Sequence, residues 1–103
     1  MNNNEDLSEK LELSGFKNVD SASMIMVRRV VDGNLKKFND NVDGFEKLKF
    51  TLKEVHGTEK SVKYQVIANI IIRNTVQSVE TVDRNIFFAL DSAVKKLEAL
   101  VKK

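Results

Sequence analysis

The chain has 103 residues, a formal net charge of +2, one histidine and neither cysteine nor proline. This length suits one domain with a single core, and no apolar run approaches the roughly 20 residues that a membrane-spanning helix needs. Without cysteine, thiolate metal sites, disulfides and thiol nucleophiles are excluded, and the lone His56 cannot form an all-histidine metal site.

The first ten residues, MNNNEDLSEK, are acidic, rich in amides and without an apolar period. We expect residues 1–10 to form a mobile acidic tail and residues 11–103 to form a single domain. The tail lacks the basic and then apolar order of a secretory signal, which together with the absence of cysteine predicts a cytoplasmic protein. Residues 1–16 hold four acids and one base, so the remaining 16 bases face 11 acids and the rest of the chain has a balance of +5. Such a bias is compatible with an acidic partner such as RNA.

The first predicted elements are a short strand and a long helix. The segment LELSGF, Leu11–Phe16, alternates apolar and polar residues as a strand does. Asp20 and Ser21 are candidate N-caps for the helix that follows. Gly33 in this helix is either a tolerated glycine or a point of close approach for a packing neighbour or a partner. The apolar stripe of the helix steps by three and four residues through Met24, Val27, Val31, Leu35, Phe38 and Val42.

Three strands and a second helix follow. Residues 45–55 place apolar side chains on one face and lysines on the other, and residues 62–73 alternate again, with Ile67 and Ile71 facing outward. A turn then leads into a shorter strand at residues 76–82, and Asp83 is the candidate cap of the last helix. The apolar stripe of that helix runs through Phe87, Leu90, Val94, Leu97 and Val101. The resulting β-α-β-β-β-α order predicts an α+β fold, in which a four-stranded, mostly antiparallel sheet carries both helices on one face.

Residues that could support catalysis are scattered. His56, beside Gly57 in a predicted hairpin loop, has no companion motif, so a solvated turn histidine is a simpler interpretation than a general base or a ligand. The segments VDG and HGTEK lack the glycine spacing of a phosphate-binding loop. Asp83 and Asp91 flank the start of the last helix, where capping and the helix dipole explain them. The sequence therefore predicts no enzyme activity, no metal, no cofactor and no small-molecule substrate.

Basic residues recur on the exposed sides of both predicted helices. Two helices on one sheet face would make these rows neighbours, and a common groove between them could contact several phosphates of RNA at once. Local ion pairs are an alternative explanation, because Asp32 and Asp91 each precede a lysine by four residues. The basic residues are Arg28, Arg29, Lys36 and Lys37 in the first helix and Lys95, Lys96, Lys102 and Lys103 in the last. The aromatic residues do not favour RNA binding, since Phe16, Phe38, Phe50 and Phe87 lie on apolar faces rather than forming base-stacking platforms.

Two stretches, LKFTLKEVHGTEKSVKYQVIANI and VETVDRNIFFALDSAVKKLEAL, make the chain recognisable. The second resembles the closing segment of the ribosome hibernation-promoting factor family, also called the ribosome-associated inhibitor or sigma-54 modulation protein family. In that family an acid opens the last helix, and a pattern like Ala-Ile-Asp-x-Ala-x-x-Lys-Leu-Glu follows. Asp83 matches the opening acid here, and the pattern is matched by Ala89, Leu90, Asp91, Ala93, Lys96, Leu97 and Glu98. The resemblance covers about residues 11–103 and is strongest in the last helix.

The resemblance implies a domain similar in layout to double-stranded RNA-binding domains. It also implies a cytoplasmic stress-response protein that binds ribosomal RNA of the small ribosomal subunit and blocks the channel for messenger and transfer RNA. By position, the eight basic residues named above are the implied RNA-binding residues. Longer family members carry a further C-terminal domain that pairs two ribosomes, and since this chain stops at Lys103 we expect the short form, which would not supply that pairing.

Two other functions stay open. Ile67 and Ile71 on the outward face of their strand could form a patch for a partner protein or for a second copy, giving a weak homo-oligomer. The chain could also be a generic binder of double-stranded RNA, which would show equal affinity for unrelated duplexes. A ribosome-binding factor would instead prefer small subunits.

Overall fold

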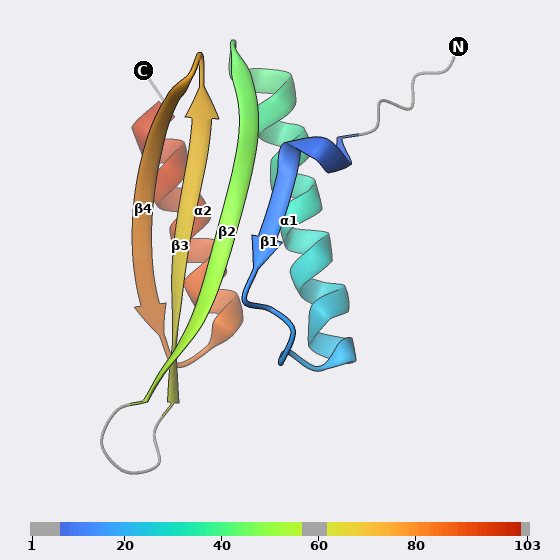
Figure 1. Ribbon diagram of the computed structural model, residues 1–103, viewed down its shortest axis with the longest axis vertical. Coiled ribbons are helices and arrows are strands. Elements are labelled where there is room, and N and C mark those ends of the chain that lie inside the picture. Colours follow the sequence, from blue (N-terminus) through green and yellow to red (C-terminus); the bar gives the residue numbers. More distant parts are fainter. Residues whose placement is uncertain (1–6, 57–61, 102–103) are drawn as a thin grey trace.

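A computed structural model describes residues 7–56 and 62–101 and contains two long helices beside one sheet (Figure 1). A short 3₁₀ turn, η1, precedes the first strand. The elements in chain order are η1 (Ser8–Lys10), β1 (Leu11–Ser14), α1 (Ser21–Asn41), β2 (Phe45–His56), β3 (Val62–Ile72), β4 (Thr75–Asp83) and α2 (Ile86–Val101). The predicted β-α-β-β-β-α order is confirmed.

The four strands form one sheet in the order β1-β2-β3-β4. β2, β3 and β4 are antiparallel neighbours, whereas β1 runs parallel to β2. The parallel pair arises because α1 crosses over between β1 and β2. The prediction of a mostly antiparallel sheet is therefore correct, and the sheet is mixed.

Both helices cover the same face of the sheet, as predicted (Figure 1). α1 packs on β2, and α2 packs on β3 and β4. Every second strand residue points into the core, so Leu48 lies opposite Ile70 and Phe50 lies opposite Ala68, all four fully buried. The other face of the sheet carries no element of the described chain.

α1 begins where the sequence indicates. Asp20 is its N-cap, and the Ser23 backbone N–H donates to Asp20 Oδ2 at 3.0 Å. Hydrogen bonds from Ser23, first from its side chain and then from its backbone N–H, hold the pKa of the Asp20 carboxyl below its ordinary value. The buried side of the helix is the predicted stripe at Val27, Val31, Leu35 and Phe38.

α2 begins differently from the prediction. Asp83 is the last residue of β4, and Asn85 caps the helix, because its Oδ1 accepts the backbone N–H groups of Phe87 and Phe88 at 2.8 and 3.1 Å. Asp83 positions the capping residue, because its Oδ1 accepts the backbone N–H of Asn85 at 2.9 Å. The assignment of Asp83 as the cap is wrong because β4 extends through Asp83, so the chain can leave the sheet only after it.

The two ends of β3 also refine the prediction. Residues Arg73 and Asn74 have φ of 48° and 64°, so they form the two-residue hairpin turn between β3 and β4. At the other end, His56 is the last residue of β2, paired with Val62, rather than a loop residue. Residues 57–61 lie outside the described chain.

The chain before β1 is part of the fold from Leu7 onward. Leu7 packs against the core, and Lys10 Nζ donates to Asn39 Oδ1 of α1 at 2.8 Å. The described part of the expected tail, residues 7–10, is therefore ordered, and residues 1–6 lie outside the described chain. None of the helices in the described residues is long and apolar enough to cross a membrane.

Candidate nucleic-acid interface

The basic residues of α1 point to two different sides of the helix. Arg28 lies beside β1, where it lines a cleft with Leu11 and Leu13. Arg29 is exposed on the outer side of the helix. Neither arginine makes an ion pair with any residue that the structure describes, so both guanidinium groups are available to an external anion.

The two lysines of α1 are already paired. Lys36 Nζ lies 3.0 Å from Asp40 Oδ2, so its partner is the acid one turn after it rather than Asp32. The alternative of a local ion pair therefore holds for Lys36 with a different acid, because the lysine extends toward the C-terminal end of the helix. Lys37 Nζ lies 2.8 Å from Glu98 Oε2 of α2, which links the two helices.

The basic residues of α2 also have different partners on different sides of the helix. Lys95 pairs with Asp91 at 3.1 Å, as the four-residue spacing predicted. Lys96 Nζ instead donates to the backbone carbonyl oxygen of Glu80 on β4, at 3.1 Å. Both lysines are exposed, whereas Lys102 and Lys103 lie outside the described residues.

The two rows therefore do not line one groove between the helices. Arg28 faces β1 and Lys96 faces β4, which are the opposite edges of the sheet. Where the helices do approach each other, the facing groups are Lys37 and Glu98, whose charges cancel. An RNA surface that touches the helical side would meet separate cations across both helices rather than one continuous basic channel.

The uncovered face of the sheet carries a second group of lysines that sequence analysis did not single out as binding residues. Lys47 and Lys49 of β2 lie on this face, and Glu12 of β1 contacts them at 3.0 and 3.5 Å. The hydrogen bond from Lys47, aided by the charge of Lys49, holds the pKa of the Glu12 carboxyl below its ordinary value. Lys53 and Lys63 are exposed on the same face. Alternating lysines along one strand were the signal for this surface.

Apolar side chains share that face. In the register between β3 and β4, Ile71 lies directly opposite Val76, which is 57% exposed. Ile67 is half-buried on the same side of β3. On the helical side, Phe88 is 63% exposed, an aromatic residue that the sequence stripe did not account for.

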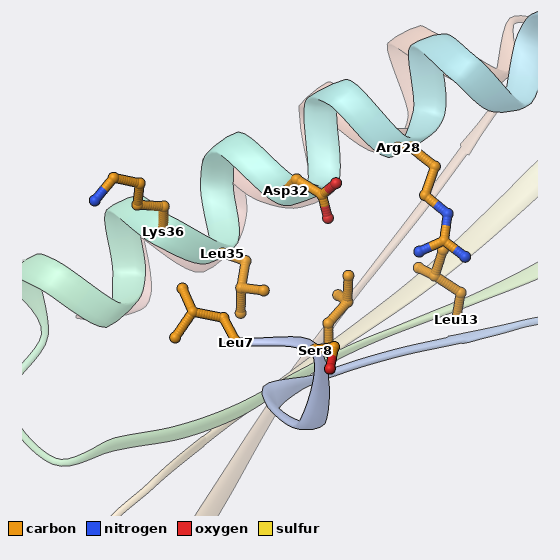
Figure 2. Close-up of a pocket in the computed structure, with 8 residues that line it drawn as sticks. Leu7, Ser8, Leu13, Arg28, Asp32, Leu35 and Lys36 are labelled. Atoms are coloured by element: carbon orange, nitrogen blue, oxygen red, sulfur yellow. The ribbon is translucent and has the colours of Figure 1, made fainter. Parts of the chain in front are cut away.

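A cleft opens between α1 and the N-terminal strand, and we call it the β1–α1 cleft (Figure 2). Its volume is about 640 Å³. One wall is apolar and the other is charged, and Figure 2 shows Arg28 and Asp32 directed from the helix toward the strand. The lining residues are Leu7, Ser8, Leu11, Leu13, Arg28, Asp32, Leu35 and Lys36.

Within residues 7–56 and 62–101, no group of three or more histidine, cysteine, aspartate or glutamate side chains could hold a metal ion. The features that stand out are exposed cations, of which Arg28 and Arg29 are unpaired among the described residues, and the β1–α1 cleft. Such features suit the binding of phosphate groups.

Comparison with known proteins identifies the fold. No protein-family model matches the chain, and no curated protein matches it significantly. Among solved structures, a ribosomal subunit interface protein from Coxiella burnetii is similar with a TM-score of 0.63 and 15% identity, covering 88% of this chain and 91% of that one. The N-terminal domain of Thermus thermophilus Protein Y is similar with a TM-score of 0.59 and 21% identity, covering 89% and 92%. This chain therefore has the fold of a ribosomal subunit interface protein and of the Protein Y N-terminal domain.

Proposed function

We propose that this protein is a non-enzymatic ribosome-binding factor of the hibernation-promoting type. It binds ribosomal RNA of the small subunit and blocks the channel for messenger and transfer RNA by occupying it. The observation that carries the proposal is the similarity in fold, over nearly the whole chain, to a ribosomal subunit interface protein. The match of Ala89, Asp91 and Lys96 to the family pattern in α2 supports it independently.

The physical basis of binding would be neutralisation of RNA phosphates by exposed cations. Each phosphate contact releases counterions, so affinity falls steeply as salt rises. Arg28 and Arg29 need not give up an internal partner, whereas Lys36, Lys37 and Lys95 must exchange an exposed ion pair worth about 0.2–1 kcal/mol. We therefore expect the arginines of α1 to contribute most among the candidate residues.

Co-sedimentation with purified small subunits over a salt series tests the proposal. The protein should travel with small subunits at low salt and leave them as salt rises. Absence from the small-subunit fraction at every ionic strength would refute the proposal. Binding of unrelated RNA duplexes with the same affinity would instead indicate a generic double-stranded RNA binder.

Charge-reversal substitutions test which surface of the protein binds the small subunit. The double substitution Lys95→Glu and Lys96→Glu should abolish co-sedimentation while circular dichroism shows an intact fold, because both side chains are exposed. The matched control is Lys53→Glu with Lys63→Glu, which reverses the same charge on the uncovered face of the sheet. Loss of binding only in the control would place the interface on the sheet rather than on the helices.

A second candidate function is self-association through the uncovered face of the sheet. The cross-strand pair of Ile71 and Val76 favours it, because paired apolar side chains on an uncovered face gain from burial against a second copy. Light scattering over a concentration series tests it. A mass that stays at 11.7 kDa at all concentrations would exclude self-association.

A further inference from the structure

The β1–α1 cleft contains an acid whose presence the proposed RNA contacts do not explain. Asp32 is exposed and lies in α1 between Arg28 and Lys36, four residues from each. It forms no hydrogen bond or ion pair with any residue of the described chain, since Lys36 pairs with Asp40 instead. An unpaired carboxylate repels phosphate, so on a phosphate-binding surface it needs a partner of its own.

The wall opposite Asp32 is apolar. Leu7, Leu11 and Leu13 are half-buried, and Leu35 closes the bottom of the cleft with 4% of its surface exposed. The volume of about 640 Å³ lies within the range of roughly 300–1,000 Å³ typical of small-ligand sites. Proteins that accept an unstacked base hold it between apolar side chains and read its hydrogen-bonding edge.

We propose that the β1–α1 cleft holds the base of an unpaired guanosine of RNA, with Asp32 as the group that selects it. A carboxylate has two oxygens and only accepts hydrogen bonds. Guanine presents two adjacent donors, N1–H and the 2-amino group, so both oxygens can be satisfied. Adenine and cytosine each place an acceptor next to their single amino donor, and uracil flanks its donor with two acceptors. These three bases therefore set a lone pair against the carboxylate.

Arg28 fits the same nucleotide. It lies one helical turn before Asp32, about 6 Å along the axis, and it has no ion-pair partner among the described residues. It can therefore neutralise a phosphate next to the guanosine while Asp32 holds its base. Lys36, one turn after Asp32, is paired with Asp40 and would have to give up that ion pair to contact a second phosphate.

This inference rests on the proposed function in assigning RNA as the partner, but its test needs no ribosome. Binding of short uridine oligonucleotides that carry one central guanosine, adenosine or uridine is measured by fluorescence anisotropy at fixed salt. We expect the guanosine oligonucleotide to bind about 10-fold more tightly than the others, the discrimination of one good bidentate contact. Asp32→Asn should bring all three affinities within about twofold of one another.

The direction of the affinity change in Asp32→Asn distinguishes recognition of the base from a general effect of charge. Removal of a negative charge strengthens binding to every oligonucleotide if charge alone matters, whereas base recognition predicts a loss for guanosine only. Glu54→Gln is the control, because it removes an exposed acid that neither lines the cleft nor pairs with a residue that does. It should keep the preference for guanosine.

Three results would overturn the inference: equal binding of the three oligonucleotides by the wild-type protein, a guanosine preference that survives in Asp32→Asn, or free guanosine monophosphate binding as tightly as the oligonucleotide. The last would make the cleft a site for free nucleotides instead. The proposed function fails separately. Co-sedimentation with small subunits without guanosine preference refutes this inference alone, and guanosine preference without co-sedimentation refutes the ribosomal assignment alone.

Discussion

Replacement of Gly33 by alanine is expected to stabilise the protein. Gly33 is exposed in the interior of α1, and a Cβ atom built there would meet nothing within 4 Å. Alanine is favoured over glycine in a helix by about 1 kcal/mol. Part of this difference arises because an unfolded chain with alanine has less conformational entropy to lose on folding. With no steric cost to offset this, the free energy of unfolding should rise by about 0.5–1 kcal/mol. The melting temperature should then rise by about 4–8 °C per kcal/mol.

Gly15→Ala is the matched substitution with the opposite sign. Gly15 has a φ of +84°, and a Cβ atom there would lie 2.1 Å from the backbone carbonyl oxygen of Leu52. Because neither backbone can yield cheaply, the cost should exceed the roughly 1–3 kcal/mol of a strained residue alone. Urea denaturation followed by circular dichroism measures both variants. A less stable Gly33→Ala variant, or a neutral Gly15→Ala variant, would refute the packing described around these glycines.

The same Gly33→Ala variant decides the question that the sequence left open at this position. If Gly33 is only a tolerated glycine, the more stable variant should co-sediment with small subunits as the wild type does. A variant that is more stable but no longer binds would show that a partner approaches the helix backbone at this point.

Three further predictions concern the helix cap, the ranking of the cations and the acid response. Asn85→Ala should lower the free energy of unfolding in urea by about 1 kcal/mol, and Asp83→Ala should lower it less; the reverse ranking would contradict the assignment of the cap. Arg29→Gln should weaken co-sedimentation with small subunits at fixed salt more than Lys95→Gln does, because only Lys95 gives up an internal ion pair; equal losses would count against this ranking. Because the folded state lowers the pKa of Glu12, its contribution to stability is present at neutral pH and is lost as pH falls below about 4. Glu12→Gln should therefore flatten the loss of stability in acid denaturation, and an unchanged curve would argue against the contacts with Lys47 and Lys49.

Most of the fold could be predicted because its signals are local and periodic. The stripe of α1 and the alternation of β3 each depend only on which side of an element faces the core. The start of α2 could not be predicted in the same way. Asp83 and Asn85 are both good caps by type, and the choice between them depends on the length of β4, which pairing with β3 extends to Asp83.

The candidate site was less predictable than the fold. The spacing of four residues gave the correct partner for Lys95 but the wrong one for Lys36, because Lys36 has an acid four residues away in each direction. The sequence placed Arg28 and Lys96 on exposed helix faces. It could not show that they lie at opposite edges of the sheet. The β1–α1 cleft brings together residues from positions 7 to 36, which no local pattern connects.

The sequence by itself determined the order of the elements, the side of each that is buried and the recurrence of basic residues on the exposed sides of both helices. These properties follow from residue type and from periods of two and 3.6 residues, so they are present before the chain folds. The tertiary structure decided which cations are paired, that the two basic rows do not share a groove, and that Asp32 faces an apolar cleft without a partner among the described residues. Those properties depend on distances between segments far apart in the chain, and packing alone sets these distances.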